Sequence, residues 1–234
     1  MNDSLPVRML RAHQYLRVAG AFPLWPPLAL LAIAAYGWFV MHNGGEARDA
    51  LFMASMIVPF AAGTGLLSLG KAGRLDLLFG TGIGRLDIWS AAALRSVLLP
   101  ITVVAAAVPL FIEGATPRTP LLAFVSLFIP AAVCFAAGIV QPRYALAVIW
   151  FAVRVIFVMS SAGRSIFLRI VQPGPGARTS TIEALMAVFA VPELVMLYRL
   201  PAVAVIAAVT LALVVLATSA FLIERADFGG HRSA

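Results

Sequence analysis

The sequence predicts an all-α membrane protein, and three observations lead to this fold class: the composition, the long apolar stretches and the positions of the few charges. Of the 234 residues, 62% are hydrophobic and 12% are charged. A typical soluble domain is about 45–50% apolar and about 25% charged, and it could not bury so much apolar surface. Composition therefore excludes a soluble globular domain, a disordered chain and a disulfide scaffold. The length leaves room for about six spanning helices of ~20 residues each.

The first expected element is an interfacial helix over residues 4–19. Apolar Leu5 and Met9 share one side of this helix, while Arg8 and Arg11 lie towards its polar side. A helix of this kind lies in the plane of the membrane interface rather than crossing the bilayer. The alternative is a solvated tail.

Six apolar stretches of spanning length follow within a single transmembrane domain, 1–234. The second and third are separated by the predicted cytoplasmic loop 70–87, and the last is followed by a polar tail, 224–234. The six predicted spans cover about 22–41, 50–69, 88–112, 120–140, 144–160 and 200–223.

The net charge of +7 is interpreted as a topology signal and not as a nucleic-acid signal. Basic residues collect in the cytoplasmic loops of membrane proteins, where they also meet anionic lipid. With the N-terminus inside, more Lys and Arg residues fall in the predicted cytoplasmic segments than in the external ones. We therefore expect a multi-pass protein of the cytoplasmic (inner) membrane, with both termini in the cytoplasm, membrane lipid around it and no nucleic-acid partner.

Residues 161–199 are too long for a simple connection between two helices. Ser180 and Glu183 form a capping-box pattern that starts a helix, Pro192 ends it, and a second short apolar piece follows. Two short helices broken by proline cannot each cross a bilayer, so we expect an external helical hairpin that enters the outer leaflet. The alternative is an irregular seventh span over 182–198, which would place the C-terminus outside.

Motifs for catalysis or metal binding are absent from the sequence. Residues 65–72 nearly match a phosphate-binding loop, but Ala72 lacks the hydroxyl that would hold magnesium, and a predicted span precedes it. The lone Cys134 excludes an intrachain disulfide and a cysteine-based metal site. We therefore expect neither an enzyme nor a metal site.

The loop 70–87 is the most informative segment for function. Leu75, Leu78 and Phe79 are spaced so that a short helix would present them together on one side, between charged residues and before several glycines. Such a helix fits a groove in a partner protein. The alternative is an ordinary interfacial loop helix.

This loop resembles the coupling segment of ABC-2 type permeases, the membrane subunits of ABC exporters, whose pattern is roughly Gly-Thr-Leu-Glu-Leu-Leu, three residues, then Pro-Val-Ser-Arg. Two positions depart from the pattern: Gly82 stands where proline is usual, and Lys71-Ala72 replaces acidic residues. In outline the resemblance covers the whole chain, from the interfacial helix to the broken hairpin. The matching positions are Gly73, Leu75, Asp76, Leu77, Leu78 and Arg85.

The resemblance implies a transport subunit without catalytic chemistry of its own. Two such permease chains, identical or related, would pair and bind two cytoplasmic ATPase subunits, which would hold ATP and Mg, so no cofactor is expected in this chain. The exported substrate would be a lipid, a drug or another amphipathic molecule. The implied ATPase-coupling residues are Gly73, Arg74, Leu75, Asp76, Leu77, Leu78, Phe79 and Arg85.

Two alternative functions remain open from the sequence. A non-transporting membrane scaffold or assembly subunit explains the spans equally well but gives no reason for the coupling loop. A membrane-embedded enzyme acting on lipid would need acid and base groups near one interface, for which Asp76, Asp87 and Glu224 are scattered candidates.

Two arginines lie within predicted spans, and an intramembrane charge is by default a functional hypothesis. The side chain of Arg95 is near enough to the inner interface to snorkel. Arg154 lies near the middle of its span, so it should face a cavity, a partner helix or a dimer seam. Either substrate contact or structural pairing would explain it, and Glu183 and Glu193 of the hairpin are the candidate partners.

Overall fold

The computed structural model describes residues 83–107, 116–140, 145–172, 174, 178–198 and 200–225, together with scattered positions between 7 and 63. Within these residues every regular element is a helix. Most of the predicted interfacial helix, most of the first two predicted spans, and loop residues 73–79 lie outside the described residues. The predicted tail lies outside them from residue 226 onwards.

The first long helix runs over Arg85–Ala107, three residues earlier than the predicted start of the third span. It consists of α5 (Arg85–Ala93), a short π-helical stretch η1 (Leu94–Leu98) and α6 (Leu99–Ala107). Pro100 lies two residues after the last residue of η1, and its ring cannot fit against the carbonyl of an ordinary preceding turn. The wider π turn accommodates this proline while the helix continues.

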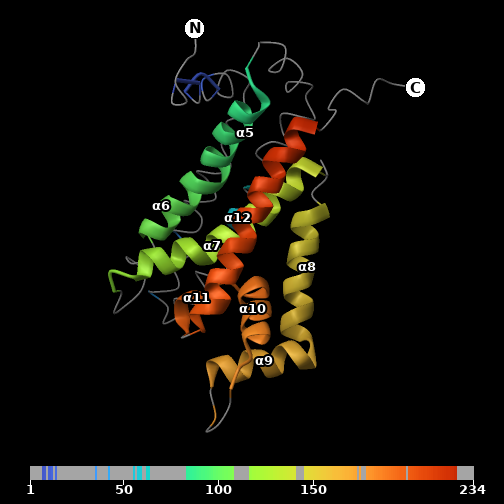
Figure 1. Cartoon of the computed structure of the whole chain (residues 1–234). Helices are drawn as coiled ribbons and strands as arrows, with labels where there is room; N and C mark the ends of the chain where they lie inside the picture. The colour runs from blue at the N-terminus through green and yellow to red at the C-terminus, as the bar shows by residue number, and fades with distance from the viewer. Residues whose placement is uncertain are drawn as a thin grey trace, which may run out of the picture.

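α7 (Thr119–Val140) and α12 (Ala202–Arg225) lie at the centre of the described helices. They pack against each other, with α6 also on α7 (Figure 1). α12 contributes Ala204, Ala208 and Ala212, which recur every four residues and are buried. Small side chains at this spacing let helix backbones approach closely, as is common in membrane helices. The bounds of these two helices agree with the predicted fourth and last spans.

α8 (Ala145–Met159) is followed at once by α9 (Ser161–Val171), and the two are bent by 77°. Ser160 makes the corner: its hydroxyl accepts a hydrogen bond from the amide of Gly163 at 2.9 Å. A Cβ on Gly163 would overlap the carbonyl oxygen of Phe157, so the corner needs glycine there. The sequence pattern indicates α8 but not α9 or the bend.

Two short helices lie in the segment for which the hairpin is predicted, α10 (Thr181–Ala190) and α11 (Leu194–Leu197). Both hydrogen bonds of the capping box between Ser180 and Glu183 are formed, which confirms the predicted start. Val191, Pro192 and Glu193 separate the two helices. Residues 182–198 therefore do not form one continuous helix.

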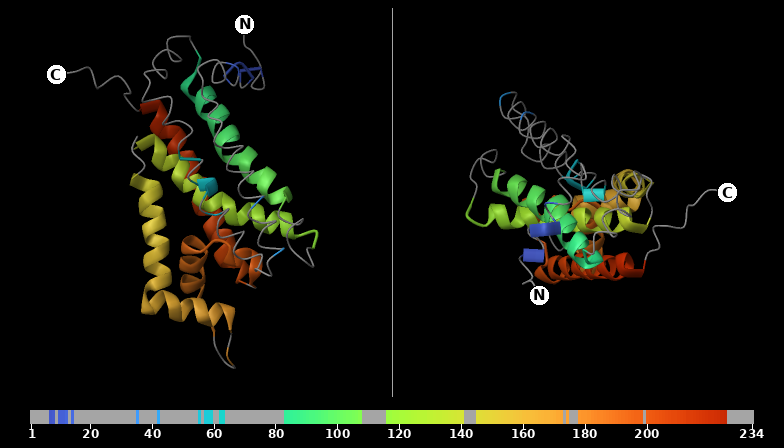
Figure 2. Two further views of the ribbon diagram at one scale, coloured as in Figure 1. Left: turned by 180° about the vertical axis from the view of Figure 1, so that it is seen from behind. Right: turned by 90° about the horizontal axis from the view of Figure 1, so that it is seen from above.

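Three described helices are long and apolar enough to cross a membrane, and the bent pair of α8 and α9 makes up to four. The protein is thus a multi-pass helical membrane protein by length and composition of its helices. The start of α5 and the end of α12 lie at one end of the bundle and α9 at the other (Figures 1 and 2). At the first end, Arg85 donates to the carbonyl of Glu224 at 2.9 Å, which satisfies a free carbonyl of the last turn of α12.

Candidate functional site

The candidate site is built around Arg154, whose side chain is 1% exposed although it lies in the middle of α8. α8 exposes apolar side chains and buries a charged one, which is the opposite of a helix in a soluble protein. Large apolar side chains of α8, among them Phe151, Val155 and Ile156, are exposed. A helix that exposes valine and isoleucine while it buries arginine fits a lipid environment, in which the charge must turn inwards.

Arg154 is held by side chains from two other segments. Its Nη2 donates to Oε1 of Glu193 at 2.5 Å, and its Nη1 donates to Oγ of Ser55 at 2.7 Å. The Ser55 hydroxyl in turn donates to Oε2 of Glu193 at 3.3 Å. All three side chains are buried. We call Arg154, Glu193 and Ser55 the buried polar cluster; it joins α8, the break before α11 and the segment around residue 55.

The break between α10 and α11 places Glu193 in this cluster. Leu194 and Val195 donate their amides to the carbonyls of Val191 and Pro192, so a tight turn carries the chain from one helix to the next. Glu193 precedes the first residue of α11, yet its carboxylate caps no amide of that helix. The carboxylate is therefore available to Arg154.

α8 and the hairpin make a second contact, one helical turn away from the pair of Arg154 and Glu193. Trp150 lies four residues before Arg154, and Phe189 lies four residues before Glu193. Their rings meet edge to face with centroids 5.0 Å apart. Residues four apart share a helix face, so α8 presents one aromatic and one ionic contact to the hairpin.

The buried polar cluster is stable only when all three of its side chains are present. Removing water from two charges costs several kcal/mol per ion, which an ion pair offsets only with good geometry and further hydrogen bonds. Ser55 supplies such bonds to both ions. Through these bonds the cluster connects three segments that are distant in the sequence.

Glu183, the other predicted partner of Arg154, pairs with Arg169 of α9 instead. The Arg169 Nη2 and Glu183 Oε1 atoms are 2.5 Å apart, and the side chains are 39% and 29% exposed. The amide of Ser180 also donates to Glu183 at 3.0 Å. This backbone hydrogen bond, followed by that of the Ser180 hydroxyl and the charge of Arg169, lowers the pKa of Glu183 below its ordinary value.

The structure thus brings together two of the four predicted intramembrane and hairpin residues, Arg154 and Glu193. Arg95 lies apart from them along the chain, half-buried in η1. Sequence reasoning missed Ser55 and Arg169. Ser55 is one of three hydroxyl residues within the apolar stretch 50–69, with Thr64 and Ser68, so no signal in the sequence singled it out.

The predicted coupling residues 73–79 lie outside the described residues, as stated above. Arg85, the last of that set, is the first residue of α5 and not part of a loop. It caps α12 at the carbonyls of Ile223 and Glu224. Among the residues that the structure describes, no group of three His, Cys, Asp or Glu side chains could hold a metal ion.

These features define a class, a helical membrane protein whose spans are joined by a broken helical segment and a buried ion pair. Comparisons with known proteins add no narrower group: no protein-family model, curated protein or solved structure matches the chain.

Proposed function

We propose that the chain is the transmembrane permease subunit of an ATP-driven exporter of a lipid, a drug or another amphipathic substrate. The observation that carries the proposal is the broken segment α10–α11 and its attachment to α8 through Arg154 and Glu193. The buried ion pair holds the hairpin against α8, and separation of the pair would give the hairpin a second position. Elements with two discrete arrangements are what alternating access requires.

A continuous set of contacts supports the proposal. Arg85, a residue of the predicted coupling loop 70–87, holds the end of α12. α12 packs against α10, and the segment after α10 carries Glu193 to Arg154 (Figure 1). Motion at the coupling loop would reach the hairpin at the other end through α12, since a packed helix transmits displacement along its length.

In this mechanism the chain itself performs no chemistry. Partner ATPases would bind ATP and Mg at the cytoplasmic face, and the apolar residues Leu75, Leu78 and Phe79 would dock into a groove on each. Two copies of the chain, or this chain and a related one, would form the pathway between them.

The test is co-purification with candidate ABC ATPases encoded near this gene. Leu78→Asp and Phe79→Asp place a charge in the docking surface and should abolish ATPase association and its stimulation. Ile182→Asp is the matched control, because Ile182 is an exposed apolar residue at the opposite end. If both loop variants keep the ATPase bound and stimulated, docking through this loop is wrong, and a non-transporting membrane scaffold becomes the better explanation.

A further inference from the structure

α9 has two chemically different faces. Ile166, Phe167 and Ile170 pack with the apolar residues of α10 and α11. The opposite face carries Ser161, Ser165 and Gln172, which fall on one side of the helix at spacings of four and seven residues. α9 is therefore an amphipathic helix whose apolar face is already covered by its own chain, while its polar face is turned outwards.

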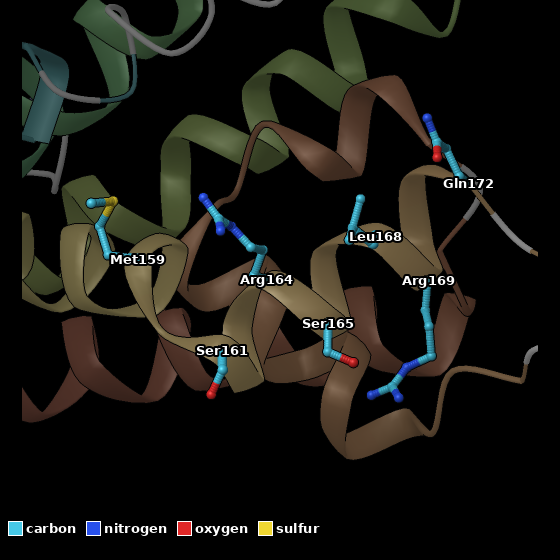
Figure 3. A pocket seen from close by; sticks show the side chains of 7 residues that line it. All are labelled: Met159, Ser161, Arg164, Ser165, Leu168, Arg169 and Gln172. Atoms are coloured by element: carbon cyan, nitrogen blue, oxygen red, sulfur yellow. The ribbon is translucent and has the colours of Figure 1, made fainter.

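The outward face borders an open pocket of about 570 Å³. Arg164 and Arg169 lie about 140° apart around the helix, with the hydroxyl and amide side chains between them. Figure 3 shows the two guanidinium groups extending to different sides of α9. The lining side chains are Met159, Ser161, Arg164, Ser165, Leu168, Arg169 and Gln172.

The position of α9 in the bundle determines the surroundings that this pocket faces. α8 has 15 residues, about 22 Å of helix, and it ends where the chain bends by 77°. α9 therefore lies across the end of the bundle, as a helix at a membrane surface does (Figures 1 and 2).

Cationic and apolar side chains meet at this surface. Met159 and Leu168 are 73% and 49% exposed, and both line the pocket beside Arg164. Within the part of the chain that the structure describes, Arg164 makes no ion pair, whereas Arg169 is partly neutralised by Glu183. A phosphate binds guanidinium and hydroxyl donors, and acyl chains contact methionine and leucine.

We propose that the outward face of α9 binds the headgroup phosphate of an anionic phospholipid, with Arg164 as the principal cation. Ser161 and Ser165 donate to the phosphate oxygens, and Met159 and Leu168 contact the upper acyl chains. A soluble acidic partner would match the arginines but would leave Met159 and Leu168 exposed to water. This site is independent of ATP-driven transport, and the failure of either proposal leaves the other standing.

The test is native mass spectrometry of the purified full chain in detergent, with phosphatidylglycerol or phosphatidylcholine added. We expect the wild-type chain to retain phosphatidylglycerol in preference to phosphatidylcholine. Arg164→Gln should lower that retention about fivefold, the effect of one arginine at an anionic surface. Arg164→Lys should keep most of it, because the charge remains.

Arg178→Gln is the matched control, since Arg178 is an exposed arginine of the segment after α9 that does not line the pocket. It should leave retention unchanged. Equal losses in Arg164→Gln and Arg178→Gln would show general charge attraction and overturn the site. Equal retention of the two lipids by the wild-type chain, or displacement of phosphatidylglycerol by millimolar inorganic phosphate, would also overturn it.

Discussion

Arg154 and Glu193, 39 residues apart in the chain, form a buried ion pair between α8 and the break before α11. The pair fixes the short hairpin to α8 in addition to the apolar packing of the hairpin. The pair stabilises the fold only when both residues are present, because a single buried charge costs far more free energy than a buried pair. The first prediction concerns this dependence.

Arg154→Leu should lower the free energy of unfolding by about 3–5 kcal/mol, because Glu193 is left buried without its cation. Thermal unfolding of the purified protein in detergent measures the loss. The double variant Arg154→Leu with Glu193→Leu should recover much of it, since two apolar residues can replace a buried pair. If the double variant is no more stable than Arg154→Leu alone, the ion pair is not the source of the loss.

Gly163→Ala should destabilise the protein by about 1–3 kcal/mol, the usual cost of forcing an added methyl group into a filled site. The new Cβ would overlap the carbonyl oxygen of Phe157 at the bend between α8 and α9. Gly174→Ala is the control, because a Cβ there would meet no atom within 4 Å. The measurement is the unfolding temperature of each variant. Similar values for the two would contradict the close approach of Gly163 to the carbonyl oxygen of Phe157.

Gly138→Val should disrupt the packing of α7, because a Cβ at Gly138 would overlap the backbone oxygen of Gly63. Backbone atoms cannot move aside as a flexible side chain can, so the two helical segments would have to separate. Ala137→Val introduces the same residue type at the preceding, less buried position and should be tolerated better. The yield of monodisperse protein after size-exclusion chromatography provides the measurement; equal yields would count against a close crossing.

The capping box and Arg169 should make stability depend on pH through Glu183. Because the pKa of Glu183 is lowered below its ordinary value, its contribution to stability is present above that ordinary value and is lost as the pH falls through the folded-state pKa. Glu183→Gln keeps the capping geometry but cannot titrate. The wild-type chain should therefore unfold at a higher temperature than Glu183→Gln at about pH 7, and this difference should shrink as the pH falls into the acidic range. A difference in unfolding temperature that stays constant from neutral to acidic pH would show that Glu183 is not the source of the pH dependence.

Several elements of the fold could be predicted because their causes are local. The apolar runs predict α7, α8 and α12 within a few residues of their ends. Ser180 and Glu183 mark the start of α10, and Pro192 marks the break, because a cap and a missing amide act on the nearest turn only. The predicted coupling loop and the ABC-2 resemblance stay predictions.

What the sequence by itself determined is the class of molecule: a chain with this apolar fraction must place its helices in lipid and turn a charge in the middle of a span inwards. Only the tertiary structure decided which carboxylate meets Arg154. Both Glu183 and Glu193 lie in the hairpin, but the bend at Ser160 sends α9, and with it Arg169, to Glu183. Glu193 and Ser55 then remain for Arg154. The difference has a physical reason: hydropathy and capping act along the chain, whereas ion pairing and the approach of Gly63 to Gly138 depend on how distant helices pack.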